Sequence, residues 1–337
     1  MIEYLHLRCG WPKVLLWPLW PLLWVLSLVF SLVVFIKNWR WDREPPVKPD
    51  RPLVISVGNL SAGGTGKTPL GLALVKWLRE KEMRVEVILR GYAAHQGFSD
   101  EAQLYVEVLG EEAVHQEPDR VLALTDMVSD KADVVLMDDA FQHRRAPRHL
   151  DLVLWDLSAP RGESHVLPLG MLREPMSSLR RADAVLMSRS ENVPEEEREM
   201  VLADFRKMSW GRERFLMTSV PLGLREWPSG EPVSLDDQSC FLVSGIGRPE
   251  AFLVTAKRMG LRVAGHHWFG DHHVYTEDDI CMIWEEAERV GAEIVVVTSK
   301  DVVKWRRGRP VCILEIETQV DERFWGWLKG QLEEMRA

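Results

Sequence analysis

The stretch SVGNLSAGGTGKTPL, residues 56–70, carries the strongest indication of fold in this sequence. Its end matches the phosphate-loop pattern G-x-x-x-x-G-K-[ST], except that Ser61 stands where the leading glycine is expected. An apolar strand pattern precedes the stretch, and a helical pattern begins near Thr68. Backbone N–H groups should therefore converge on an anion at the positive end of that helix. We predict a phosphate-binding loop and expect that a small residue suffices at position 61.

The predicted nucleotide-binding residues form one run: Ser61, Ala62, Gly63, Gly64, Thr65, Gly66, Lys67 and Thr68. The glycines allow the backbone to curl closely around phosphate oxygens. Lys67 supplies a cation for the β- and γ-phosphates of ATP, and the Thr68 hydroxyl is placed for Mg²⁺. A glycine-rich turn without a ligand is the alternative, but the glycines, the Lys-Thr pair and the flanking elements all favour a nucleotide site.

Alternating strands and helices surround this loop. Short apolar or β-branched runs occur at residues 53–58, 84–89, 133–137, 151–155 and 183–187. After Lys67, apolar residues at Leu70, Leu74, Trp77 and Leu78 are spaced for one buried helix face. Near-continuous apolar strands separated by helices are typical of a parallel sheet covered on both faces. The pattern predicts an α/β fold of the phosphate-loop NTPase type, with a doubly wound parallel sheet.

A second, smaller α/β domain should follow this one. Residues 221–240 contain three prolines and two glycines with little periodicity, so we place a linker there. Beyond it, strands are predicted at 241–247, 293–299 and 312–317, and helices at 249–259, 276–290 and 321–335. The predicted domains are an N-terminal membrane anchor (1–37), a phosphate-loop domain (38–225) and a smaller C-terminal α/β domain (226–337).

The N-terminal segment differs from the rest of the chain. Residues 14–36 run for 23 positions without a charge, which is long enough for a helix to cross a bilayer. Pro18 and Pro21 would bend its first turns, and several tryptophans favour the water–lipid boundary. A spanning helix and a helix lying in one leaflet are both compatible with this pattern, and a soluble buried hairpin is a weaker alternative. The chain is predicted to be tied to a membrane.

Charge and cysteine content exclude several classes of protein. The formal charge of −9 gives no global sign of nucleic-acid binding, and no obligate protein partner is evident. The four cysteines lie far apart without C-x-x-C spacing, so neither a disulfide framework nor a zinc knuckle is indicated. Contacts with anionic partners must therefore be local.

The stretch VVLMDDAFQHRRAPRH, residues 134–149, is the second candidate for chemistry. Asp138 and Asp139 end an apolar strand, where an acidic residue can hold Mg²⁺ in a phosphate-loop enzyme. A helix cap or a solvated strand end is the alternative. A local basic cluster follows, consisting of His143, Arg144, Arg145, Arg148 and His149. Guanidinium groups suit phosphate, although a solvated basic face is an equal alternative for any one arginine.

Histidines gather near residue 270. His266, His267, His272 and His273, with Asp271, lack the i, i+4 spacing of a helical zinc site, so a histidine oriented by a carboxylate for proton transfer is the better match. Farther on, TSKD at 298–301 has its lysine one place too late for the guanine-reading pattern [NT]-K-x-D. GTP specificity is therefore not predicted.

Eight segments in one order resemble the tetraacyldisaccharide 4'-kinase family of lipid A biosynthesis. They are VGNLSAGGTGKTP (57–69), RGY (90–92), SDEA (99–102), DDAFQHRR (138–145), LPLGMLREP (167–175), GIGRPEAF (245–252), FGDHHVYT (269–276) and VTSKDVVKW (297–305). The resemblance implies transfer of the γ-phosphoryl group of ATP to the 4'-hydroxyl of a tetraacylated disaccharide 1-phosphate. It also implies action at the cytoplasmic face of the inner membrane, with the N-terminal segment as anchor.

The resemblance also implies roles for single residues. Asp100 and His272 would form the proton-accepting pair beside Lys67. The Mg²⁺ ligands would come from Thr68, Glu101, Asp138 and Asp139. Substrate contacts would come from Asn59, Arg120, Gln142, His143, Arg144, Arg173 and Glu174.

Three positions depart from the family pattern: Ala140 and Met171 replace glycine and proline, and Ser299 replaces glutamate. Ala140 should leave Mg²⁺ binding intact, whereas Met171 puts the local loop shape in question. Two other functions stay open from the residues alone. A membrane-associated phosphate-loop ATPase switch would need no Asp100 and His272 pair, and a kinase for another amphiphile would share every feature of the loop.

Overall fold

The computed structural model describes residues 20–91, 99–159, 165–208, 212–234, 238–247, 249–270, 273–305 and 309–336. The chain divides into two compact units. Unit 1 comprises Met1–Tyr92, Tyr105–Thr218 and Val320–Ala337, and unit 2 comprises Ala93–Leu104 and Ser219–Gln319. The domain boundary predicted between residues 225 and 226 stays a prediction.

Unit 1 contains a parallel sheet in the order β7-β6-β5-β1-β4-β2-β3. Its strands are β1 Leu53–Asn59, β2 Val85–Leu89, β3 Val114–Gln116, β4 Val134–Asp138, β5 Leu150–Asp156, β6 Ala184–Ser188 and β7 Glu213–Trp227. The five strands predicted for this region are confirmed. Strand β3 was missed because three residues show no periodicity. Strand β7 was missed because Pro221 and Gly223 suggested a break, so part of the predicted linker is in fact strand.

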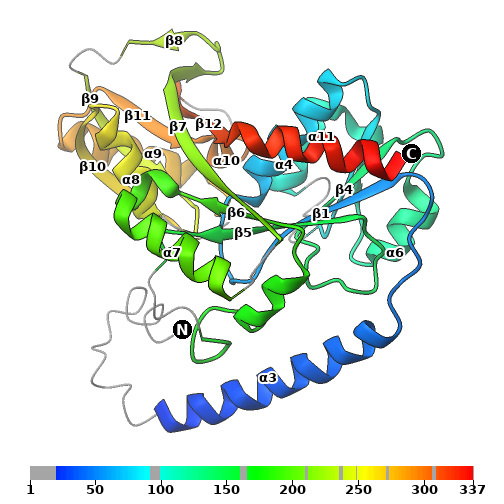
Figure 1. The fold of residues 1–337 in the computed structure, drawn as a ribbon. Helices are drawn as coiled ribbons and strands as arrows, with labels where there is room; N and C mark the ends of the chain where they lie inside the picture. Colours follow the sequence, from blue (N-terminus) through cyan, green and yellow to red (C-terminus); the bar gives the residue numbers. More distant parts are fainter. Residues whose placement is uncertain are drawn as a thin grey trace. The chain divides into compact units, whose positions relative to one another are not determined.

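Helices cover both faces of this sheet (Figure 1). They are α4 Lys67–Glu80, α7 Glu195–Lys207 and α11 Glu322–Arg336, with the short α6 Arg120–Leu122; α5 Asp100–Leu109 has residues in both units. On one face, Trp77 of α4 stacks on Trp325 of α11 with ring centroids 5.4 Å apart. On the other face, Leu202 and Phe205 of α7 join the core formed by β5 and β6. The doubly wound arrangement predicted for this unit is confirmed.

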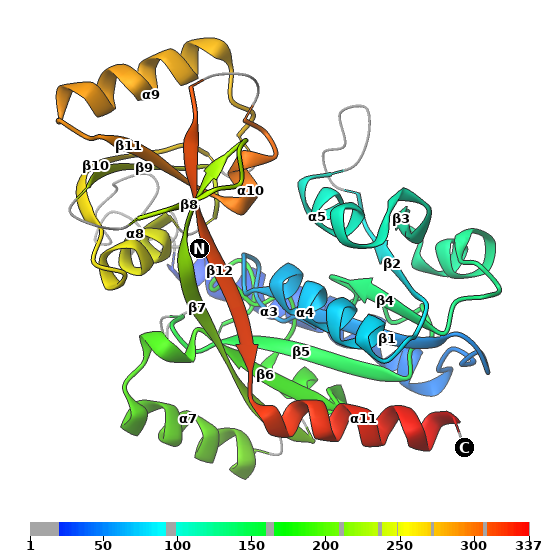
Figure 2. The ribbon, with the colours of Figure 1, turned by 90° about the horizontal axis from the view of Figure 1, so that it is seen from above.

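Unit 2 contains a second parallel sheet in the order β10-β9-β11-β12. Its elements are β8 Pro232–Val233, β9 Ser239–Ser244, α8 Pro249–Arg258, β10 Arg262–Trp268, α9 Glu277–Arg289, β11 Ile294–Thr298, α10 Ser299–Val302 and β12 Val311–Val320. Phe241 and Val243 pack under α9, whereas Cys240 and Leu242 pack under α8. Figure 2 shows α8 and α9 on opposite sides of these strands. Alternate residues of β9 therefore serve two separate apolar layers, as expected for a doubly wound sheet.

The N-terminal apolar segment forms helix α3, Trp20–Arg43. By length and composition α3 could cross a membrane, and most of its large apolar side chains are exposed. Ser27 is its only buried described residue. The predicted helix is thus present from residue 20 onward, and residues 14–19 lie outside the described part of the chain.

Candidate active site

The predicted phosphate loop connects β1 to α4. Ser61, the position without the expected glycine, forms an isolated bridge with Leu172. Among the described non-glycine residues, positive φ occurs at Glu82, Asp139 and Arg189, so Ser61 has an ordinary backbone conformation. Because only a left-handed conformation would favour glycine here, serine fits the loop entrance without strain.

Two side chains support the phosphate loop through hydrogen bonds. The Asn59 side-chain amide donates to Thr65 Oγ1 at 2.9 Å and to the Gly63 carbonyl at 3.3 Å. The Gln142 amide donates to the Asn59 carbonyl at 2.8 Å. Asn59 Oδ1 and Gln142 Oε1 are buried and have no hydrogen-bond partner among the described residues. The two predicted substrate residues Asn59 and Gln142 thus also support the shape of the loop.

The end of the loop leaves backbone donors available. Gly66 precedes α4 with φ 93°, and no side chain caps the helix at this position. A Cβ atom at Gly63 or Gly64 would meet no described atom within 4 Å. Backbone N–H groups at an uncapped helix N-terminus attract anions. The loop therefore combines open space with a positive helix end.

Lys67 and Arg173 converge on Asp139. The Lys67 ammonium lies 3.4 Å from Asp139 Oδ1, and the Arg173 guanidinium donates to both Asp139 oxygens at 3.1 and 3.0 Å. Burial alone would raise the pKa of Asp139, but the charges of Lys67 and Arg173 hold it below its usual value. Asp139 is therefore ionised at neutral pH, next to the predicted phosphate-binding lysine.

Asp138 is more deeply buried than Asp139 and belongs to a different network. Its carboxylate accepts from the Tyr105 hydroxyl at 3.1 Å and from the Asp139 backbone N–H at 2.8 Å. Tyr105 fits against α4 only because residue 71 is glycine, where a Cβ would come within 1.9 Å of the tyrosine oxygen. The two predicted metal ligands thus lie side by side, with different partners.

A cavity of about 300 Å³ is connected to Asp138 through Arg120, which lines the cavity and donates to the Asp138 carbonyl at 2.9 Å. It is lined by Pro118, Asp119, Arg120, Val121, His143, Arg145 and Ala146. Burial lowers the pKa of Arg120 to about 10, so the guanidinium stays protonated at neutral pH. Burial, with the charge of Arg120, lowers the pKa of His143 to about 4, so its imidazole is neutral. Two predicted substrate residues, Arg120 and His143, therefore share one basic cavity.

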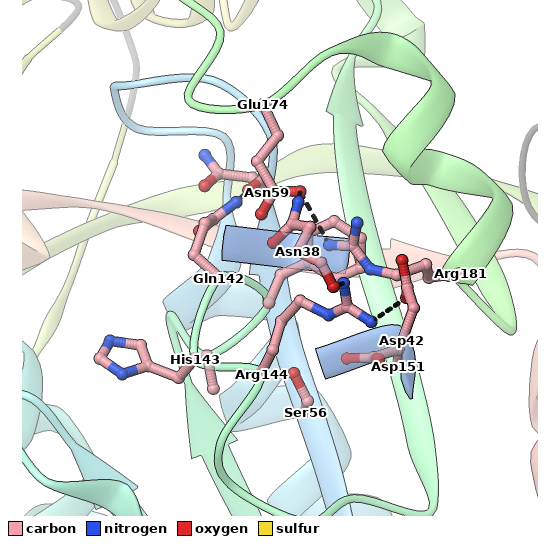
Figure 3. Close-up of polar contacts among 12 residues, drawn as sticks. Asn38, Asp42, Ser56, Asn59, Gln142, His143, Arg144, Asp151, Glu174 and Arg181 are labelled. Carbon is pink, nitrogen blue, oxygen red and sulfur yellow. Dashed lines mark hydrogen bonds and ion pairs between the residues drawn. The ribbon is translucent and has the colours of Figure 1, made fainter. Parts of the chain in front are cut away.

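The other basic residues of the cluster have separate partners. Arg144 donates to the Asn38 carbonyl of α3 at 2.8 Å and pairs with Asp42 (Figure 3). Arg148 binds Asp151 and carbonyls of the 140–146 turn. His149 accepts from the Val54 backbone N–H at 2.9 Å. Arg145 pairs with Asp119 and faces the cavity. Arg144 bonds to α3, and its predicted substrate contact stays a prediction.

Unit 2 carries the predicted proton-accepting residue Asp100. The Lys304 ammonium, only 6% exposed, lies 2.9 Å from Asp100 Oδ2. Lys300 lies 3.4 Å from Glu101 Oε1. His272, the predicted partner of Asp100, lies outside the described residues. Each described acidic residue of the predicted SDEA site is thus paired with a lysine of the 299–305 segment.

The remaining histidines of the cluster bind carboxylates or stack on rings. His267 and His273 lie 2.9 and 3.0 Å from Glu286 and Asp279, and His266 stacks on Trp268. No group of three metal-ligating side chains occurs among the described residues. Asp301 of TSKD is fully buried and accepts from the Gly245 backbone N–H and the Tyr275 hydroxyl. This aspartate supports the fold of unit 2.

Sequence reasoning missed one arginine at the phosphate loop. Arg189 follows β6 in a left-handed conformation, donates to the Gly64 carbonyl at 2.9 Å and pairs with Asp156 at the end of β5. Strands β1, β5 and β6 are parallel neighbours, so their carboxyl ends share one edge. The signal that could have identified them was a polar residue at the end of an apolar strand: Asp156 is the last residue of β5, and Arg189 directly follows β6.

The comparisons with known proteins agree with this geometry. The family model described as tetraacyldisaccharide-1-P 4'-kinase matches residues 19–333. Tetraacyldisaccharide 4'-kinases of Anaeromyxobacter sp. (strain K) and Geobacter metallireducens are 34% and 33% identical to this chain. The matches cover 82% and 84% of this chain, and 78% and 88% of those proteins.

This chain is also similar to a crystal structure of a related protein. The chain is similar to LpxK from Aquifex aeolicus, solved in complex with ATP, with a TM-score of 0.72 and 26% identity. The similarity covers 95% of this chain and all of that one. On the family match, this chain belongs to the tetraacyldisaccharide-1-P 4'-kinases.

Proposed function

We propose that this protein transfers the γ-phosphoryl group of ATP to the 4'-hydroxyl of a tetraacyldisaccharide 1-phosphate. The observation that carries the proposal is the open glycine loop with Lys67 beside an ionised Asp139, in a chain of this family. ATP is the proposed donor because the related LpxK of Aquifex aeolicus was solved in complex with it.

The loop would act by positioning and by neutralising charge, which is most of what phosphoryl transfer requires of a protein. The backbone N–H groups of residues 63–68 and the Lys67 ammonium would hold the phosphates. Lys67 and Arg173 both pair with Asp139. When phosphate oxygens enter, Lys67 and Arg173 can turn toward them because both lie at the same carboxylate. These two cations would stabilise the negative charge on the moving phosphoryl group.

The donor set suits Mg²⁺. The Thr68 hydroxyl and the Asp138 and Asp139 carboxylates of unit 1 are hard oxygen ligands, and Glu101 is the predicted fourth. Mg²⁺ in kinases is commonly held by one or two carboxylates together with phosphate oxygens and water. When bound, Mg²⁺ neutralises phosphate charge.

The acceptor chemistry needs one base. The 4'-oxygen attacks the γ-phosphorus, the bond from that phosphorus to the β,γ-bridging oxygen breaks, and ADP leaves. The hydroxyl proton passes to Asp100 or His272, the predicted pair. Lys304 keeps Asp100 oriented and next to a positive charge. The basic cavity formed by Arg120, His143 and Arg145 would receive an anionic group of the acceptor.

We also propose that α3 lies in one leaflet of the cytoplasmic membrane, and does not cross the bilayer. The Ser27 hydroxyl donates to the Val166 carbonyl at 2.7 Å, and Asn38 donates to Glu174 at 3.0 Å. These two attachments are eleven residues apart, which is about 16 Å along a helix. A helix held to a globular unit at two such points lies along its surface. Its outward apolar side chains, including Leu32, Val33 and Phe35, can then enter the lipid while the sugar reaches the site.

The proposed function is tested by incubating the purified protein with γ-labelled ATP, Mg²⁺ and the lipid disaccharide. Label should enter the lipid fraction. Label released only as inorganic phosphate would identify an ATPase switch, and transfer to a polyprenol in preference to the disaccharide would identify another amphiphile kinase. Deleting residues 1–36 should weaken use of vesicle-embedded acceptor more than ATP binding. Equal loss of both would show that the segment is needed for folding.

A further inference from the structure

Helix α3 is joined to a loop that itself contacts the phosphate loop. Residues 165–174, which we term the clamp loop, close on themselves through bonds from the Leu167 N–H to the Leu172 carbonyl and from the Leu172 N–H to the His165 carbonyl. The Ala62 N–H donates to the Met171 carbonyl, and the Arg173 N–H to the Leu60 carbonyl, both at 2.7 Å. The clamp loop is therefore bonded through its backbone to the entrance of the phosphate loop. Since the bond from Ala62 uses the backbone carbonyl of Met171, it does not depend on the Met171 side chain.

Both ends of the clamp loop are attached to α3. Ser27 holds the Val166 carbonyl near one end, and Asn38 donates to Glu174 at the other. Glu174 is only 3% exposed and also accepts from Arg181 at 2.9 Å. Figure 3 shows Asn38 and Asp42 of α3 meeting Glu174, Arg181 and Arg144. Glu174 is thus the point where the membrane helix and the clamp loop meet.

Glu174 is also close in the chain to the cations around Asp139. Arg173, its neighbour in the chain, donates to Asp139, which also pairs with Lys67. Arg181 lies over the ring of Phe141, and Phe141 packs so closely on Gly58 of β1 that a Cβ there would come within 2.5 Å. A shift of Glu174 would therefore move Arg173 relative to Asp139. Catalytic groups keep their geometry only when such supporting contacts are fixed.

We propose that Asn38 is a positioning residue for phosphoryl transfer: through Glu174 it fixes the clamp loop, and with it Arg173 and the entrance of the phosphate loop. The membrane anchor is then part of the support of the active site as well as a means of attachment. This inference rests on the proposed function for its kinetic test, but its structural test is independent of it.

The kinetic test uses the full chain and acceptor dispersed in detergent, where bilayer attachment is not required. Asn38→Asp places a carboxylate against Glu174, and kcat should fall by about tenfold to a hundredfold. Binding to phosphatidylethanolamine–phosphatidylglycerol vesicles should change by less than about twofold, because the apolar face is intact. The double variant N38D/E174Q restores a hydrogen bond with reversed polarity, so its kcat should rise at least about fivefold above that of N38D.

A matched control is Ser31→Ala on the same helix. The Ser31 hydroxyl donates to the Ser27 carbonyl inside α3, so its loss should leave kcat unchanged. If N38D keeps wild-type kcat, or loses vesicle binding while kcat in detergent is unchanged, Asn38 serves attachment alone and the inference is overturned.

Hydrogen exchange supplies the independent measurement. In N38D, the amides of Ala62 and Arg173 should exchange at least about tenfold faster, because their acceptors belong to the junction between the clamp loop and the phosphate loop. Faster exchange in a protein that phosphorylates no lipid would reject the proposed function and leave the link intact. Unchanged exchange at both amides would reject the link, even in an active kinase.

Discussion

Two turns that follow parallel strands, one in each unit, differ in what they do with similar residue types. In unit 1, β1 leads through three glycines to Lys67 and Thr68 at the start of α4. In unit 2, β11 leads to Thr298, Lys300 and Asp301 at the start of α10. The first turn leaves space at Gly63 and Gly64 and lacks a side-chain cap. In the second, the Thr298 side chain caps the helix and Asp301 is fully buried.

The difference teaches that residue type at a strand end is not sufficient to predict a site. Both turns contain a threonine and a lysine; the carboxylate lies within the turn in unit 2 (Asp301), whereas in unit 1 it comes from Asp139, which follows β4. Asp301 fills its own turn by accepting from Gly245, Tyr275 and Thr298 at 2.6 to 2.9 Å. Asp139 instead faces two cations, Lys67 and Arg173, next to open backbone donors. An open turn favours an incoming anion, whereas a closed turn contributes only to stability.

Removal of the lysine at the open turn should have the largest effect. We expect Lys67→Met to lower phosphoryl transfer by about a thousandfold, because a cation aligned with the developing charge is lost. The free energy of unfolding should change little, since Asp139 keeps its ion pair with Arg173. Steady-state transfer assays and thermal unfolding measure the two quantities. Lys76→Met, at an exposed position of the same helix, is the control and should be active. Wild-type rates in Lys67→Met would show that the open turn is not the phosphate site.

Substitution of the carboxylate in the closed turn should instead affect mainly the stability of the protein. Asp301→Ala leaves the Gly245 N–H and the Tyr275 hydroxyl without this acceptor in a buried place. We expect a loss of about 3 kcal/mol in the free energy of unfolding, measured with urea. Asp278→Ala, on the exposed first turn of α9, should cost far less. A stable Asp301→Ala protein with lost ATP binding would place Asp301 in a ligand site and remove the contrast.

A single methyl group tests whether the open turn is open for a ligand. The φ angle of Gly64 lies outside the left-handed region, and a Cβ atom added to this residue would meet no described atom within 4 Å. Gly64→Ala should therefore fold normally yet bind ATP about tenfold more weakly, because the methyl group hinders close approach of phosphate to the backbone. Calorimetry measures this affinity. Gly326→Ala in α11, equally free of contacts, should leave ATP binding unchanged. Equal affinities for Gly64→Ala and wild type would argue that phosphate lies elsewhere.

Most of the fold was predictable because it depends on local patterns. Five of the seven strands of unit 1, and helices α8 and α9 of unit 2, follow from apolar runs and their spacing. Strand β7 was not predictable, since Pro221 and Gly223 normally interrupt a strand. The phosphate loop was found despite Ser61 because glycine is needed only where φ is positive, at Gly63 and Gly66.

The site was predictable only where neighbours in the chain act together. Lys67 follows the glycines directly, whereas Arg173, Arg189 and Glu174 reach their partners across long loops. The role of Arg144 as a holder of α3 depends on Asn38 and Asp42, about a hundred residues earlier in the chain. A cluster such as HRRAPRH shows its charge in the sequence, but which arginine faces a cavity depends on tertiary packing.

The smallest expected effect is a loss of stability in acid that comes from His143 in the cavity of unit 1. Burial and the charge of Arg120 lower the pKa of His143 from 6.5 to about 4, so between these values the unfolded chain binds a proton that the folded chain does not. Stability should therefore fall as the pH drops from 6.5 to 4, with no further loss from this group below that range. After allowance for partial exposure, we expect about 1 kcal/mol from His143. Urea unfolding at pH 7 and pH 4.5 measures this loss, and His143→Gln should reduce it by that amount. An equal loss in wild type and variant would mean that His143 accepts a proton in the folded cavity, which would then favour anions more strongly in acid.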